Sequence, residues 1–461
     1  MPPRILQPLR RRDFALLWSG LTVSLLGDGV YTVALAWQVY NLSGAPTALS
    51  FVALAWTIPQ LILLLVGGAL SDRIERRRVL LGADLLQALA IGAIGALSVT
   101  GTLRLWQLFL LVPLVGAGEA LFAPAYAAIV PELVHRDDLL QANALNQISR
   151  PLMLRVAGPA LGGTLIAATG VGWAFVVDAA TFAASISAFL AIAQRPVLRQ
   201  TIETPSLGHE VSRGISYVRS QPWLLGTLIA SSLGMMFFLG PVFVLMPFMV
   251  KHVLGGSSTD LGLVFAAGGV GAIGASLLIG GRALPRRPLV VVYVAWTFMC
   301  LQLVGYGVAR SLWTIVLASF AGTALLVTGQ ILWSTLLQRH VPSALLARVA
   351  SLDSLLSFGL VPISYAVTGP IAVAVGARAT LIAAGCISAA ILAGTVVLYP
   401  RGRDVPSGTE DGAAGVGQEP GLEQERHDLG LTDGLTVEAL DGEPFRAAAF
   451  HVRDERVERD S

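Results

Sequence analysis

Long apolar blocks alternate with short polar connections along the first 400 residues of the chain. A helix needs about 20 mostly apolar residues to cross the roughly 30 Å of hydrocarbon in a bilayer. Backbone groups in lipid must be hydrogen-bonded within their own segment, so we expect each block to be a helix. The pattern predicts twelve spans, numbered here in chain order: 14–40, 47–71, 79–100, 105–130, 140–168, 171–194, 223–249, 260–282, 288–309, 312–338, 345–372 and 376–399.

Arginine is concentrated in alternate connections between these blocks. One set of connections holds 18 arginines, whereas the other set holds four basic residues, Arg104, Lys251, Arg310 and Arg378. Connections rich in Lys and Arg remain on the cytoplasmic side. We therefore expect a multi-pass protein of the cell (plasma) membrane with both termini cytoplasmic, as an even number of spans requires.

The overall composition agrees with a membrane protein and sets the tail apart. Hydrophobic residues make up 54% of the chain and charged residues 13%, whereas soluble domains carry about 25% charge. From Arg401 onward, 15 acidic residues accompany 7 basic ones. We expect residues 400–461 to form an acidic, mostly disordered cytoplasmic tail, either solvated or docked on the basic inner face. A hairpin within 435–452 is the alternative for part of it.

The two halves of the chain match at an offset of 211 residues. The matched pairs are Val130-Pro131 with Val341-Pro342, Pro151 with Pro362, and Gly158-Pro159 with Gly369-Pro370. Repeated membrane halves are a transporter architecture, with the substrate site near the midplane between them. We expect a six-helix half at 1–194 and another at 223–399. A cytoplasmic linker at 195–222, containing an amphipathic helix, would join them.

A polar motif follows span 2, in the stretch GALSDRIERR at residues 68–77. It resembles the loop motif of the major facilitator superfamily, although Glu75 stands where that motif has a glycine. The matching residues are Gly68, Asp72, Arg73, Arg76 and Arg77. The resemblance extends over roughly residues 10–400. It implies an all-α membrane protein with a major facilitator-like fold of 12 transmembrane helices in two six-helix halves.

Two interpretations of this loop motif stay open. The Asp72 carboxylate can accept hydrogen bonds from the N-terminus of a neighbouring helix, and the helix beginning near Leu345 is the obvious partner. The arginines can pair with acids or with anionic headgroups. Either the motif is a cytoplasmic gate that must break for the inner side to open, or it is a topology signal alone.

Span 5 carries a second motif, which comprises Gly158, Pro159, Gly162 and Gly163. It is similar to the core of a motif associated with drug:proton antiporters in the same superfamily, although Leu154 replaces its upstream glycine. The proline removes a backbone donor and bends the helix. The glycines either seal the protein against leakage during antiport or serve close packing only. Other short strings, such as Phe122-Ala-Pro-Ala, resemble the branch of macrolide and siderophore (enterobactin-type) exporters.

We single out five ionisable residues inside the spans, where a charge costs about 2.5–3.5 kcal/mol and often marks a functional site. They are Asp28, Glu119, Arg150, Arg155 and Asp178. The resemblance implies that spans 1, 4, 7 and 10 line the cavity, which places Asp28 and Glu119 there. A carboxyl group that alternates between an apolar environment and a cation changes its affinity for protons. We expect Asp28, Glu119 and Arg155 to couple protons or contact substrate.

Structural alternatives accompany each of these residues. Glu119 could form a permanent ion pair with Arg155, and Asp28 could be a satisfied carboxylate at a helix irregularity. Arg150 and Asp178 are expected to form structural pairs. In the second half, Gln330 takes the position of Glu119 at the 211-residue offset, and Trp333 lies within the same span. Both are candidates for the cavity lining and suit an apolar ligand.

The sequence therefore predicts a secondary active transporter that exports amphipathic drugs or secondary metabolites in exchange for protons, by alternating access. A siderophore exporter, an uptake permease and a non-transporting membrane sensor are the alternatives. No Gly-x4-Gly-Lys-Ser/Thr phosphate loop, His/Cys cluster or nucleophile constellation occurs in the sequence. We expect no enzymatic activity, no metal or other cofactor and no nucleic-acid partner. The expected partners are a small-molecule substrate, protons and the lipid bilayer, and the expected state is a monomer.

Overall fold

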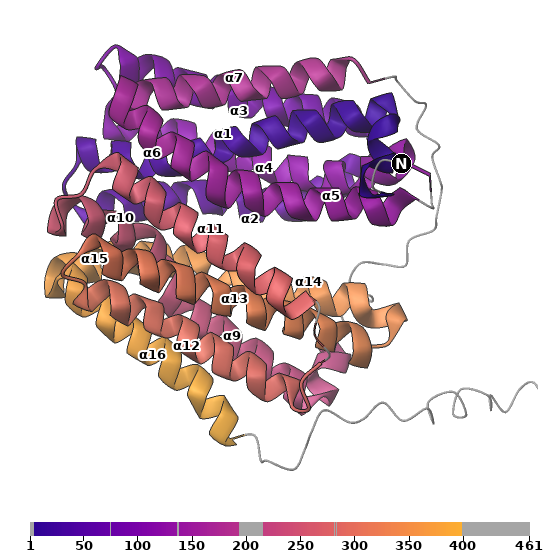
Figure 1. Cartoon of the computed structure of the whole chain (residues 1–461), viewed down its shortest axis with the longest axis vertical. Helices are drawn as coiled ribbons and strands as arrows, with labels where there is room; N and C mark the ends of the chain where they lie inside the picture. Colours follow the sequence, from indigo (N-terminus) through magenta and orange to yellow (C-terminus); the bar gives the residue numbers. More distant parts are fainter. Residues whose placement is uncertain are drawn as a thin grey trace, which may run out of the picture. The chain divides into compact units, whose positions relative to one another are not determined.

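The computed structural model describes residues 4–73, 75–135, 138–192, 215–280, 282 and 284–398. Within these ranges the regular structure is helical, and twelve segments are long and apolar enough to cross a membrane. The predicted all-α class and number of spans are confirmed. Every described residue belongs to one compact unit, residues 1–407 (Figure 1). The acidic tail and most of the linker lie outside the described residues.

The first half comprises six spans that pack mainly with one another. Helix α1 packs on α7, α3 packs on both α7 and α4, and α2 packs on α4. The fifth span is divided by a π-helical segment that links α5 to α6. The elements are α1 (Arg12–Leu42), α2 (Pro46–Arg73), α3 (Arg76–Val99), α4 (Leu105–Leu133), α5 (Leu139–Pro151), the π-helical segment (Leu152–Ala157), α6 (Gly158–Thr169) and α7 (Val171–Leu190).

The second half repeats this plan. Helix α12 packs on α16 and α13, and α11 packs on α13. Its first span, like the fifth span of the first half, contains π-helical turns, which flank the short α10. The elements are α9 (Pro222–Gly240), π-helical Pro241–Leu245, α10 (Met246–Phe248), π-helical Met249–Val253, α11 (Ser258–Gly280), α12 (Pro288–Val308), α13 (Leu312–His340), α14 (Ser343–Gly359), α15 (Val361–Val375) and α16 (Ala377–Leu398).

Equivalent glycines bring helices together in both halves. Gly29 of α1 lies against the start of α6, so that a Cβ there would come 2.8 Å from the Cα of Gly158. Gly240, its equivalent at the 211-residue offset, lies against α15, where a Cβ would come 2.5 Å from the carbonyl oxygen of Ser364. Real Cβ atoms do not approach other atoms so closely. The predicted repeat therefore corresponds to a repeated packing contact.

Equivalent turns also close the fifth and eleventh spans. Gly170 ends α6 with φ 90° and Gly376 ends α15 with φ 89°. Glycine adopts this left-handed conformation without the steric cost that a side chain brings. In the first half the interruption of the span begins after Pro151, and in the second half α14 gives way to α15 just before Pro362. The two prolines, Pro151 and Pro362, are again 211 residues apart.

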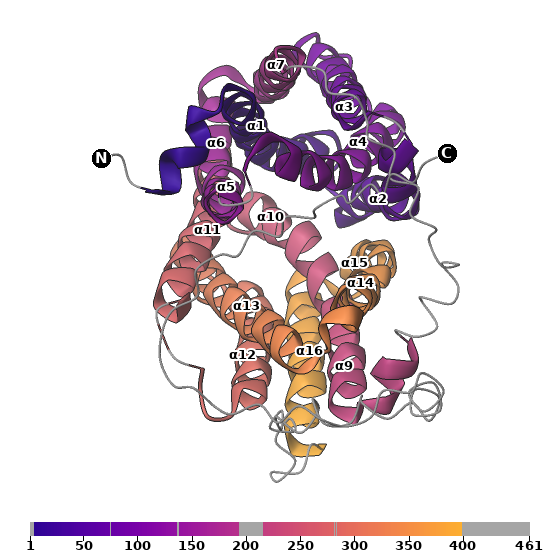
Figure 2. The same ribbon diagram turned by 90° about the vertical axis from the view of Figure 1, so that its right-hand side faces the viewer.

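The two halves are joined mainly at one end of the helices. We call the end where α1 and α3 begin, at Arg12 and Arg76, the basic end, and the end where α1 stops, at Leu42, the opposite end. Hydrogen bonds that join the two halves, among the side chains the structure describes, lie at the opposite end. Figure 1 shows the two sets of helices meeting there and diverging towards the basic end, which Figure 2 views end-on.

Candidate functional site

Three of the predicted site residues lie at the middle of their helical spans. Glu119 is the central residue of α4, Arg155 is central in the span Gln141–Thr169, and Asp28 is one residue from the centre of α1. The Glu119 and Asp28 side chains are partly exposed, and that of Arg155 is exposed. Ionisable groups that face lipid are costly, so we expect these partly exposed groups to face away from the lipid.

Glu119 is the centre of a polar cluster within the first half. Gln60 of α2 donates a hydrogen bond from Nε2 to Glu119 Oε2 at 3.0 Å. Asp28 of α1 and Arg150 at the end of α5 lie within electrostatic range of the Glu119 carboxyl. Arg150 also lies within range of Asp28. The structure thus brings the predicted site residues Asp28 and Glu119 together with Arg150, which was expected in a structural pair, and adds Gln60, which the sequence analysis missed.

The π-helical segment sets the placement of the two arginines. Residues five apart come close to the same face where i→i+5 hydrogen bonding widens a helix. Arg155 accordingly lies within electrostatic range of Arg150, and both side chains are exposed. The proposed ion pair between Glu119 and Arg155 is not among the salt bridges of the described residues. Arg150, rather than Arg155, is the cation near Glu119.

Two further acids are completely buried behind this cluster. Asp178 of α7 and Asp84 of α3 are each 0% exposed. Both lie within electrostatic range of Asp28. Asp84 was missed in the sequence, although it stands eight residues inside α3, or about 12 Å from Arg76 at 1.5 Å per residue. The rule that intramembrane acids are functional candidates would have found it.

The second half lacks an equivalent cluster among its described residues. Gln330 is exposed on α13, whereas Trp333 is only 3% exposed. The Trp333 ring packs against Trp223 and Trp296, and its Nε1 donates to Asp353 Oδ2 at 3.2 Å. Trp333 is therefore placed in the interior of the second half and satisfies an acid. Gln330 remains the candidate for the cavity lining.

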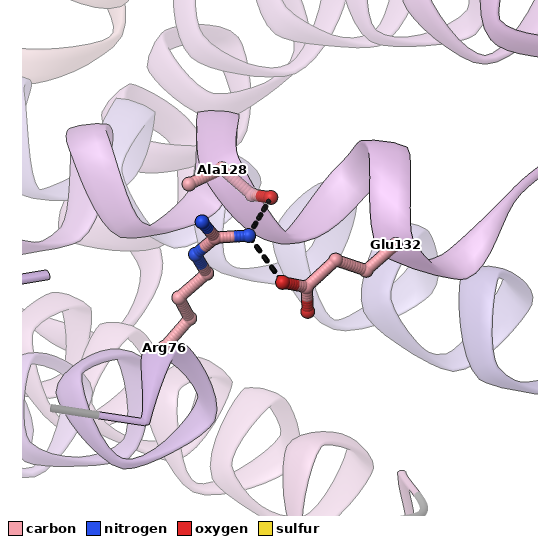
Figure 3. A network of polar contacts seen from close by, with 3 residues as sticks. All are labelled: Arg76, Ala128 and Glu132. Atoms are coloured by element: carbon pink, nitrogen blue, oxygen red, sulfur yellow. Dashed lines mark hydrogen bonds and ion pairs between the residues drawn. The ribbon is translucent and has the colours of Figure 1, made fainter. Parts of the chain in front are cut away.

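The loop motif is described only in part. The surroundings of Gly68 and the side chains of Asp72 and Arg73 are outside the part that the structure describes. Arg76 donates to the Ala128 carbonyl oxygen at 2.9 Å and forms an ion pair with Glu132, both on α4 (Figure 3).

Arg77, the last residue of the loop motif, binds the end of α7. Its guanidinium donates at 2.7 Å to each of the carbonyl oxygens of Phe189 and Leu190. Carbonyls at a helix C-terminus lack partners within the helix, and a cation complements the negative end of its dipole. These contacts of Arg76 and Arg77 hold α3 to α4 and α7 within the first half.

The glycine motif of span 5 packs on two helices at once. Gly158 lies so close to α1 that a Cβ would come 2.6 Å from the Cα of Gly29. Gly163 faces α11 of the second half, where a Cβ would come 2.6 Å from the Ser258 carbonyl oxygen. Ser258 Oγ donates to the Gly163 carbonyl oxygen at 3.0 Å. The motif, which also contains Pro159 and Gly162, is thus part of the contact between the halves.

A second contact between the halves forms at the opposite end, which we call the clasp. Lys251 donates from Nζ to Asn41 Oδ1 and, at 3.3 Å, to the Trp37 carbonyl oxygen. Its ammonium group lies 4.5 Å from the centre of the Trp37 ring. Tyr40 donates from its hydroxyl to the Val244 carbonyl oxygen at 2.6 Å. The sequence analysis treated Lys251 as a loop charge and did not foresee the clasp.

Comparison with known proteins identifies the family. The sequence profile of the transmembrane secretion effector family matches residues 4–457. The chain is 27% identical over 405 residues to the multidrug efflux pump Tap of Mycolicibacterium fortuitum, covering 85% of this chain and 96% of that pump. It is 29% identical over 338 residues to the enterobactin exporter EntS of Citrobacter koseri, covering 72% and 78% of the two chains.

Solved structures share the fold. A bacterial homologue of the iron transporter ferroportin, captured in an inward-facing state, superimposes with a TM-score of 0.64 at 17% identity. The match covers 83% of this chain and 98% of that one. Together with twelve spans in two repeated halves, these similarities show that the chain belongs to the transmembrane secretion effector family of major facilitator transporters, whose named relatives are efflux pumps and exporters.

Proposed function

We propose that this protein exports amphipathic, preferably cationic, small molecules in exchange for protons, with Glu119 and Asp28 as the coupling acids. The observation that carries the proposal is the partly exposed Glu119 carboxyl at the centre of α4, bonded to Gln60 and within range of Arg150. A proton and a cationic substrate compete for the same carboxyls. Such competition gives the negative coupling between two ligands that exchange transport requires.

One proton supplies enough free energy for this exchange. Moving one charge down about 100 mV releases about 2.3 kcal/mol. A difference of one pH unit adds about 1.4 kcal/mol. The two together correspond to a several-hundred-fold gradient of a neutral solute, because about 1.4 kcal/mol equals a factor of ten. A monovalent cation exchanged for one proton moves no net charge, so the pH difference alone drives it, with a limit of about tenfold per pH unit.

The proposal includes a conformation and an orientation. The arginine-rich connections support a cytoplasmic basic end with both termini inside, in the cell membrane and with the protein acting as a monomer. The clasp at Lys251 then lies on the outer side, so the state described here is open to the cytoplasm. Export requires the clasp to break and the basic end to close, for which the loop motif from Gly68 to Arg77 is the candidate gate.

A siderophore exporter is the second candidate function. It is favoured by Arg150 and Arg155, two exposed arginines that lie within electrostatic range of each other. Two guanidinium groups side by side suit an acidic ligand with planar oxygen pairs, because the guanidinium fork binds such groups through two parallel hydrogen bonds. The similarity to the enterobactin exporter points the same way.

The test uses the full chain in proteoliposomes with an imposed pH gradient and two dyes, cationic ethidium and anionic carboxyfluorescein. We expect gradient-driven accumulation of ethidium, which Glu119→Gln abolishes without abolishing dye binding. Asp353→Asn is the matched control, since it alters an acid bonded inside the second half, and it should retain accumulation. Full gradient-driven transport by Glu119→Gln would refute the coupling role. Transport of carboxyfluorescein alone would favour the siderophore-type function.

A further inference from the structure

The interface between α1 and α7 contains an acid that neither hypothesis uses. Asp178 is 0% exposed, and its Oδ2 atom has no hydrogen-bond partner. Its Oδ1 atom accepts one long hydrogen bond, 3.4 Å from Thr181 Oγ1. The same carboxyl touches the backbone of α1 at Gly27, since a Cβ on that glycine would collide with Asp178 Oδ1. Asp178 is therefore in contact with Gly27, the residue before Asp28.

The groups that face Asp178 are mostly acidic. Asp28 and Tyr31 face it from α1, and Glu119 from α4. Thr181 of its own helix supplies the one hydroxyl contact. An ionised carboxylate buried without a cation and with one weak partner is disfavoured, so Asp178 holds a proton as long as Asp28 is ionised.

The protonated form of Asp178 is also incompletely satisfied. A carboxylic acid with a purely structural role donates its proton to a nearby acceptor, as buried polar groups almost always find a partner. Neither oxygen of Asp178 has such an acceptor among the described residues other than the Thr181 hydroxyl. The site is thus built to stabilise neither the ionised nor the neutral form. A third buried acid, Asp84, lies within electrostatic range of Asp28 from α3.

We propose that Asp28 and Asp178 form a proton-sharing pair across the α1–α7 interface, in which buried Asp178 is a second proton site behind the partly exposed Asp28. When Asp28 is ionised beside Arg150, Asp178 holds the proton. Transfer of that proton to the Asp28 carboxylate leaves the negative charge on Asp178, and no atom or net charge is lost. This inference rests on the proposed function for its role in transport, but the pair itself can be measured without transport.

Two interacting acids lose their protons in two steps that belong to the pair rather than to either residue. The test is infrared difference spectroscopy of the purified full-length protein, following the carboxylic acid C=O band as pH rises. Subtracting the spectra of Asp178→Asn and Asp28→Asn from that of the wild type isolates the two groups. We expect two coupled steps in the wild type and one in each variant, with the remaining step displaced by about one pH unit or more.

A structural control keeps the result interpretable. Ser187→Ala also lies on α7, and it removes an exposed hydroxyl that is bonded to the Ala183 carbonyl oxygen of the same helix. It should leave both steps unchanged. If Asp178→Asn does not fold, the titration of the Asp178 band in Asp28→Asn, compared with the wild type, still shows whether the two acids are coupled. Two steps that are unchanged when the other acid is removed would overturn the pair. Loss of transport in Glu119→Gln has no bearing on these spectra, so the two proposals fail separately.

Discussion

The two halves of this transporter share their packing but not their chemistry. Gly29 and Gly240 bring equivalent helices together, and Gly170 and Gly376 turn the chain in the same way. The intramembrane acids do not follow this symmetry. The comparison teaches that close helix packing is the repeated requirement, whereas ionisable chemistry is needed once.

The positions in the second half that are equivalent to these acids hold neutral residues. At the 211-residue offset Asp28 corresponds to Leu239, Asp84 to Ala295 and Glu119 to Gln330. Counted from the turn glycines Gly170 and Gly376, Asp178 corresponds to Ala384. The described part of the second half carries two acids: Asp260 is bonded to Ser257 at the start of α11, and Asp353 is bonded to a buried tryptophan. In the proposed mechanism, proton and substrate meet in the first half, and the second half provides the facing surface.

The largest expected effect comes from moving the acid across the repeat. The double variant Glu119→Gln/Gln330→Glu carries the same number of acids, but Asp28 and Arg150 remain in the first half. We expect the accumulation of ethidium, about tenfold per pH unit, to fall to none, as we also expect for Glu119→Gln alone. Dye accumulation in proteoliposomes measures it. Recovery of coupling would show that the halves are chemically equivalent.

A smaller effect is expected where the halves are alike. Gly29→Leu and Gly240→Leu both insert a side chain against a helix backbone, which costs about 1–3 kcal/mol or more when the helices cannot separate. We expect similar losses of thermal stability in the two variants. Gly274→Leu, at a glycine with open space around it, is the control. Destabilisation by only one of the two substitutions would break the packing symmetry.

The smallest expected effect concerns the clasp, which joins the two halves and is not a contact repeated within each half. Lys251→Met removes a charge-assisted hydrogen bond and a cation–π contact, worth about 1.5 kcal/mol together. The outward-open population should rise about tenfold. Spin labels at Thr102 and Arg310 would report the distance between the halves. Arg378→Met, which breaks a bond to Gly307 within the second half, should not change that distance.

The sequence predicted the spans, the repeat and the central acids because hydropathy and charge at each position are local properties. Contacts between helices depend on how each helix is rotated, which spacing alone does not determine. Trp333 was therefore expected at the cavity and lies inside its half, bonded to Asp353. Arg150 lies at the end of α5, just before the π-helical segment, and its proximity to Glu119 is not revealed by the composition of span 5.

The contact between α6 and α11 has a mechanical consequence. Gly163 and Gly262 approach so closely that a Cβ on either would come 3.1 Å from the other's Cα, and Gly269 lies against the Arg155 carbonyl oxygen. At these glycines the backbones of the two halves meet directly. We expect this seam to serve as a pivot, since rotation about it displaces few side chains there. The barrier to switching would then be set by the contacts that must break, at the clasp and at the candidate gate.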